Sequence, residues 1–93
     1  LYVVPYHDVT DETFTISAVN MNVAAESNTN FIKVESDIGL TGTIAGTEAT
    51  IITSGDPTAG QIKIDYDSGA LTFNASDVGS TAVISYRWLE RPE

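Results

Sequence analysis

The feature that most constrains the fold of this chain is the alternation of apolar and polar residues between Gln61 and Trp88. Successive side chains of a β-strand point to opposite faces, so this alternation predicts strands with one buried and one solvated face. Strands are predicted at Gln61–Tyr66, Leu71–Phe73 and Thr81–Trp88. We interpret these three strands as a β-meander.

The two connections within this segment carry recognisable turn residues. Asp67-Ser68-Gly69 predicts a tight turn, because glycine adopts positive φ without steric cost. Asn74–Ser80 predicts one helical turn, with Ser76 and Asp77 suited to capping it and Gly79 to ending it. The side chains predicted to point inward are Ile62, Ile64, Tyr66, Leu71, Phe73, Ala82, Ile84 and Tyr86.

The N-terminal third is less regular. Leu1–His7 is apolar, but Pro5 cannot donate to a ladder, so this segment is predicted as an edge strand or as an arm that docks on a neighbouring subunit. Asp8–Thr13 is predicted as a polar turn. Further on, the apolar phase flips at Ala18–Val19, which predicts a bulge or a strand break.

Further short strands are predicted between polar loops and glycine-containing turns. Their ranges are Phe31–Glu35, Thr41–Ala45 and Ala49–Thr53, with loops at Ala24–Asn30, Ser36–Gly39 and Gly55–Gly60 and a tail or linker at Leu89–Glu93. Seven or eight strands at such spacing predict one all-β domain over residues 1–93, a small antiparallel β-sandwich or barrel of Ig-like form.

Composition excludes several classes of partner. The chain of 93 residues has no cysteine and a net charge of −9, with 4 basic against 13 acidic residues. Nucleic acids and anionic membrane surfaces attract clustered lysine and arginine. The four basic residues are instead scattered, so neither partner is expected; they are Lys33, Lys63, Arg87 and Arg91.

The residue types that carry catalysis appear only in weak patterns. His7 is the only histidine, and no nucleophile motif accompanies it, so a surface or interface histidine is expected. Asp65 and Asp67 could serve as a Ca²⁺ site or a glycosidase pair, but the calcium-loop pattern is not met. We expect a solvated turn in which Asp67 bonds its own backbone.

Three other groups have plain structural interpretations. The acidic cluster of Asp8, Asp11 and Glu12 is expected to be a solvated turn. Tyr86 and Trp88 could form an aromatic platform for a sugar or peptide, but their parity favours packing in the core or at a subunit interface. Lys63 and Arg87 lie on the polar face of their strands, where each could pair with an acid. No catalytic, cofactor-binding or metal-binding residue is predicted.

One stretch resembles a known class of module. Ile64-Asp65-Tyr66-Asp67-Ser68-Gly69 is followed by Leu71-Thr72-Phe73, by Gly79 and by Val83-Ile84-Ser85-Tyr86. This order is similar to that of a β-module that recurs in structural proteins of tailed bacteriophages. Asp8–Thr13 followed by Phe14-Thr15-Ile16 also resembles the entry to such modules.

The resemblance implies a non-enzymatic virion component. The expectation we favour is a capsid decoration or cement protein in many copies on the shell. Two alternatives stay open: a module of a tail fibre, baseplate or adaptor protein, and a bacterial surface adhesion or carbohydrate-binding domain of Ig-like form. The expected partners are capsid or tail proteins of the same virion and further copies of the chain. The expected location is the capsid exterior or the tail, after assembly in the host cytoplasm.

Overall fold

The longest strands of the computed structural model, which describes residues 5–91, are β1 (Tyr6–Thr15) and β9 (Thr81–Glu90). They pair antiparallel along nearly their whole length. The other edge of β9 pairs with β3 (Phe31–Val34) and then with β4 (Thr41–Ile44). The two-residue β5 (Thr47–Glu48) pairs with β4 and completes a five-stranded sheet.

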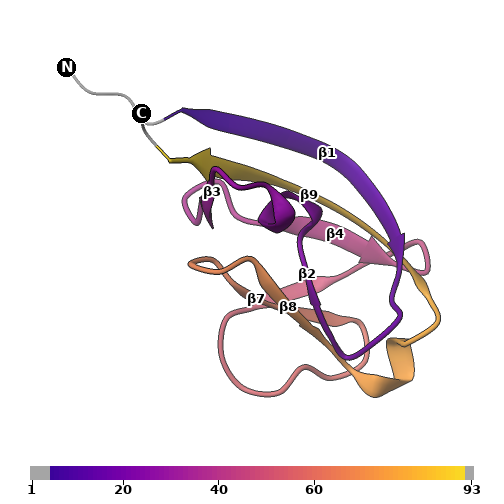
Figure 1. The fold of residues 1–93 in the computed structure, drawn as a ribbon. Helices are drawn as coiled ribbons and strands as arrows, with labels where there is room; N and C mark the ends of the chain where they lie inside the picture. Colours follow the sequence, from indigo (N-terminus) through magenta and orange to yellow (C-terminus); the bar gives the residue numbers. More distant parts are fainter. Residues whose placement is uncertain (1–4, 92–93) are drawn as a thin grey trace.

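A second sheet of four strands packs against the first (Figure 1). Its order is β2 (Asn20–Asn22), β8 (Ala70–Phe73), β7 (Gln61–Asp65) and β6 (Thr50–Ile52). All pairings are antiparallel except that of β6 with β7, which is parallel. The predicted all-β sandwich is therefore confirmed.

The predicted meander is wrong in one respect, because its third strand does not pair with the first two. β7 and β8 form a hairpin in the four-stranded sheet, whereas β9 is the central strand of the opposite sheet. The connection over residues 74–80 carries the chain from one layer to the other. Alternation indicates which side chains are buried, but it carries no information on which strand is the neighbour.

The connection itself contains the predicted helical turn, η2 (Ala75–Asp77), but a different residue caps it. The Asn74 side chain accepts a hydrogen bond from the Ser76 amide at 2.9 Å. Asp77 instead accepts from the Gly60 amide, also at 2.9 Å, and so ties the connection to the loop before β7. Gly79 has a φ of +98°, as its predicted role at the end of the turn requires.

The core lies between the two sheets and matches the predicted inward set closely. Every residue of that set is buried except Tyr66, which is half-buried, packs against the core and accepts a hydrogen bond from the Leu40 amide. The remaining buried hydrophobic residues lie in β3, β4 and β9 and in the segments that flank strands; they are Ile16, Val23, Val34, Leu40, Ile44, Ala49 and Trp88.

Two predictions near the termini are corrected. Residues 8–13 are not a turn but the middle of β1. Their polar composition is typical of a turn, but backbone pairing with β9 holds them in an extended strand. Residues 89 and 90 are not tail but the end of β9, paired with Tyr6 and Phe31. Residues 1–4 and 92–93, which complete the predicted arm and tail, lie outside the described range.

The predicted strand break near Ala18–Val19 is confirmed and has a clear cause. β1 ends at Thr15 in one sheet, and β2 begins at Asn20 in the other. The chain therefore changes layer between them, which reverses the side of the strand that faces the core. A similar change of layer at Ala49 places β6, which covers most of the predicted strand over 49–53, in the opposite sheet from β4 and β5.

Candidate functional site

A β-bulge in β1 determines where the acidic residues of this strand point. Val9 pairs with Tyr86 and Glu12 pairs with Ile84, so β1 holds one residue more than β9 between these pairs. Asp11 has a φ of +56°, and its amide donates a hydrogen bond to Ser85 Oγ at 3.0 Å. An extra residue changes which face the following side chains occupy. As a result Glu12 faces the core while Asp11 stays exposed.

Glu12 is part of an internal polar network, so its predicted place in a solvated turn is wrong. Its Oε1 accepts a hydrogen bond from the Tyr86 hydroxyl at 2.5 Å, and its Oε2 accepts from the Ala24 amide at 3.1 Å. The Tyr86 hydroxyl also accepts from the Ala25 amide at 3.3 Å. Burial raises the pKa of Tyr86 strongly, and the bond to Glu12 raises that pKa further. The network anchors η1 (Ala24–Ser27) to the sandwich.

The aromatic residues at the end of β9 are packed rather than displayed. Tyr86 is 3% exposed and Trp88 is 8% exposed. His7 stacks on Trp88 with ring centroids 4.5 Å apart, and Phe31 lies 6.0 Å from the indole on another strand. Core packing, the favoured interpretation, is confirmed for both residues, and their burial argues against a platform for sugar.

His7 has a structural role in this packing. Its Nε2 lies 2.5 Å from Glu90 Oε2, and Glu90 Oε1 accepts from the Asn30 side-chain amide at 3.5 Å. These contacts join the start of β1 to the end of β9. His7 is half-exposed, in line with the surface position predicted for it.

On the opposite face of the same strands, Arg87 and Asp8 form an ion pair, as predicted for Arg87. The guanidinium donates to both Asp8 oxygens, at 2.7 and 3.3 Å, and its carbon lies 3.9 Å above the centre of the Tyr6 ring. Hydrogen bonding to Arg87 lowers the pKa of Asp8 and raises that of Arg87. The pair is solvent-exposed, so it contributes little to stability.

The two aspartates of the β7–β8 turn act differently from the prediction. Asp65, not Asp67, bonds the turn backbone, because its Oδ1 accepts from the Asp67 amide at 3.0 Å. Both residues are exposed, and they line an open hollow of about 470 Å³ with Lys63 and Ser36. Within residues 5–91, no three side chains of histidine, cysteine, aspartate or glutamate come together in a way that could hold a metal ion.

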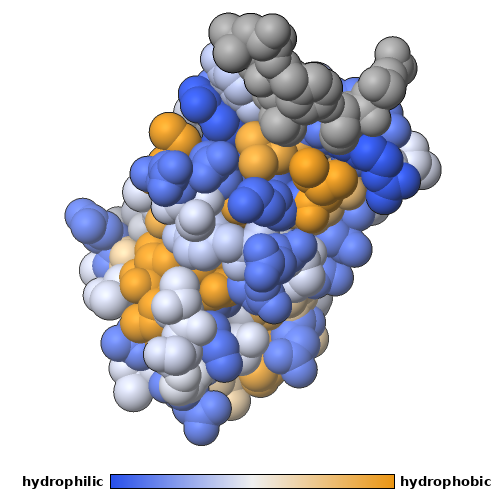
Figure 2. All heavy atoms as spheres, turned by 90° about the vertical axis from the view of Figure 1, so that its left-hand side faces the viewer, coloured by the Kyte–Doolittle hydropathy of each residue, from blue (hydrophilic) through white to orange (hydrophobic). Residues whose placement is uncertain are grey.

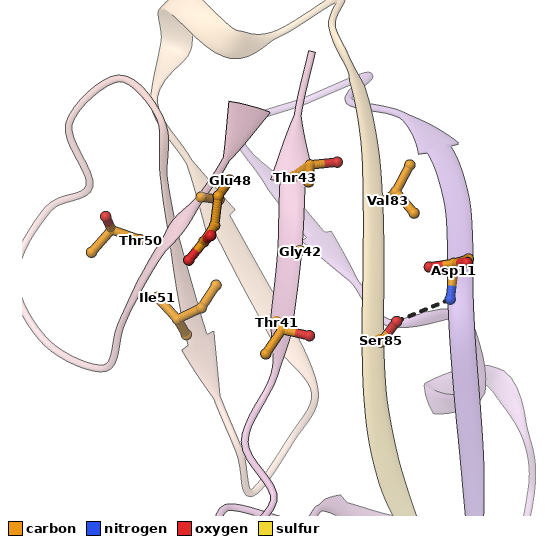
Figure 3. Close-up of a pocket in the computed structure, with 10 residues that line it drawn as sticks. Asp11, Thr41, Gly42, Thr43, Glu48, Thr50, Ile51, Val83 and Ser85 are labelled. Atoms are coloured by element: carbon orange, nitrogen blue, oxygen red, sulfur yellow. Dashed lines mark hydrogen bonds between the residues drawn. The ribbon is translucent and has the colours of Figure 1, made fainter. Parts of the chain in front are cut away.

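A groove of about 680 Å³ lies on the outer face of the five-stranded sheet (Figure 3). Its middle is formed by small side chains of β4 and β9, and Asp11 and Glu48 lie on opposite sides of it. Ile51 closes the side next to the second sheet. The residues that line it are Asp11, Thr41, Gly42, Thr43, Glu48, Ala49, Thr50, Ile51, Val83 and Ser85.

The sequence alone did not reveal this groove. The sequence marks Asp11 only as part of an acidic cluster, and no local pattern distinguishes Glu48 or the threonines of β4. The groove depends on the pairing of β4 with β9 and on the bulge in β1, and both are long-range features. The one local signal is the run Thr41-Gly42-Thr43, whose small side chains leave little volume above the sheet.

Comparison of the chain with protein-family models, with curated proteins and with solved structures gives no significant match. None of the helices in the described residues is long and apolar enough to cross a membrane.

Proposed function

We propose that this protein is a non-enzymatic structural component of a tailed-bacteriophage virion. The role we favour is that of a capsid decoration protein, which stabilises the shell through contacts repeated over many copies. The proposal begins with the likeness of the segments around Ile64–Phe73 and Val83–Tyr86 to modules of such virions. It does not rest on any catalytic residue.

The observation that carries the proposal is the position of the two ends of the described chain. The Glu90 amide donates to the Pro5 carbonyl at 2.8 Å, so both ends of the described chain lie at the same pole of the sandwich (Figure 1). The domain is elongated, with extents of 46 × 23 × 19 Å. A body of this shape can be attached at one pole while its sheet faces remain available to neighbouring subunits.

Three titratable side chains of β1 are engaged in contacts within the scaffold. Glu12 bonds Tyr86 and the Ala24 amide, His7 bonds Glu90, and Asp8 bonds Arg87. These contacts give each side chain a role in joining β1 to the rest of the fold. The large negative charge supports solubility before assembly.

The test is to look for the chain in purified virus particles. Quantitative mass spectrometry should find it in a fixed, high ratio to the major shell protein, and gold-labelled antibody against the domain should mark the capsid. Labelling of the tail would instead support a fibre, baseplate or adaptor module. Absence from particles together with display on the bacterial surface would overturn the proposal in favour of an adhesion domain.

A further inference from the structure

The groove on the outer face of the five-stranded sheet continues beyond its own boundary. A second hollow, of about 250 Å³, shares Thr41 and Ser85 with it. This second hollow is bordered by Asp8 and by Ile38, whose side chain is 55% exposed. The two hollows therefore form one track across β4, β9 and β1, which we call the outer-face groove.

The groove is shallow and open, which favours an extended chain over a small molecule. Small-molecule pockets usually enclose most of the ligand surface. Here the floor consists of short side chains, including Thr43, Val83 and Ser85, on paired strands that lie side by side (Figure 3). A peptide in extended conformation could lie along such a floor without any change in the backbone.

The charges around the groove have one sign. Asp11 and Glu48 are exposed on its two sides, and none of the residues that line this hollow is lysine or arginine. Arg87, which follows Tyr86 of the adjoining hollow in the sequence, is paired with Asp8. With a net charge of −9 on the whole chain, the groove is complementary to a positively charged partner.

Apolar residues are dispersed over the side of the molecule that Figure 2 shows, where they form separate patches among polar ones. The large exposed apolar side chains of the described residues lie in different parts of the sequence, at Tyr6, Val19, Ile38 and Val78. A second copy of this chain would also carry a net charge of −9, and the repulsion between like charges opposes contact between two copies at the groove.

We propose that the outer-face groove binds an extended, basic segment of a partner protein, with lysine or arginine side chains reaching Asp11 and Glu48. The bulge in β1 serves this site, because it keeps Asp11 on the outer face while Glu12 turns inward. This inference does not depend on the virion role. It holds equally for an adhesion domain, and its test does not involve virus particles.

The experiment measures binding of a synthetic ten-residue peptide of alternating lysine and threonine by fluorescence anisotropy at low and at physiological salt. Binding should be saturable and should weaken as salt rises. The double variant Asp11→Asn/Glu48→Gln should bind about three- to tenfold more weakly, because two exposed charge pairs are lost. Filling the groove with Thr43→Trp should also weaken binding.

The matched control is Asp56→Asn/Asp67→Asn, which removes the same charge from exposed positions outside the groove. It should change binding less than twofold. Equal losses in both double variants would mean non-specific attraction and would overturn the proposal. It would also be overturned by the absence of saturable binding, or by light scattering that shows a dimer which dissociates in the Asp11→Asn/Glu48→Gln variant.

Discussion

The two faces of the five-stranded sheet are formed by the same strands, but one face is buried in the core and the other is open to solvent. On the inner face, Ile84 and Tyr86 are buried against the second sheet. On the outer face, their neighbours Val83 and Ser85 line an open groove between two carboxylates. The inner face forms the core, whereas the outer face carries the groove proposed as a binding site.

The largest expected effect comes from the inner face. Ile84 is 0% exposed at the centre of β9, so Ile84→Ala should lower the free energy of unfolding by about 2–5 kcal/mol. Val83→Ala, one residue away on the outer face, should cost less than about 1 kcal/mol. Urea denaturation of both variants measures the difference. Similar costs at the two positions would contradict the division between the faces.

The close approach of β4 to β9 should be the next most sensitive feature. A Cβ at Gly42 would lie 2.6 Å from the Val83 carbonyl oxygen and 2.9 Å from Ile84 Cγ2. Gly42→Ala should therefore destabilise the fold by about 1–3 kcal/mol and loosen the β4–β9 pairing, as measured by thermal unfolding and amide exchange. Thr43→Ala, on the outer face of the same strand, is the control and should leave exchange at β4 unchanged.

A smaller effect should appear at alkaline pH. The pKa of Tyr86 is raised in the folded state, so the folded protein retains a proton that the unfolded chain loses above about pH 10. Stability from this group is complete below that pH and falls as pH rises above it. Tyr86→Phe removes the titrating hydroxyl, so the urea midpoint of the wild type should fall more steeply than that of the variant between pH 9 and 11. Parallel curves would contradict the role of Tyr86.

The sequence predicted the inner face well, because burial leaves a local pattern. Seven of the eight predicted inward residues are buried, and the eighth, Tyr66, packs at the edge of the core. The sequence does not predict which strands pair with each other. Its alternation predicts a meander of β7, β8 and β9, whereas in the structure β9 pairs with β1, β3 and β4. Pairing depends on contacts between distant segments, which periodicity does not report.

The outer face was harder to predict for the same reason. Residues 8–13 are polar because one side of β1 faces solvent and because Glu12 satisfies an internal hydroxyl and an amide. Composition alone makes that stretch look like a turn. The bulge at Asp11 shifts the alternation within the strand, so a period-two reading of β1 fails where the site begins.

The most direct test of the difference between the faces uses two adjacent residues, Asp11 and Glu12. Glu12→Gln replaces one of two acceptor oxygens by an NH2 donor, so that either the Ala24 amide or the Tyr86 hydroxyl proton loses its acceptor. This should cost about 1–2 kcal/mol of stability without changing binding of the lysine–threonine peptide. Asp11→Asn should change the free energy of unfolding by less than about 0.5 kcal/mol, because asparagine tolerates positive φ. The same variant should weaken binding of the peptide about two- to threefold. We expect this crossed result because Glu12 faces the core and Asp11 faces the groove. If Asp11→Asn instead destabilises the fold and Glu12→Gln weakens binding of the peptide, the assignment of the two faces is wrong.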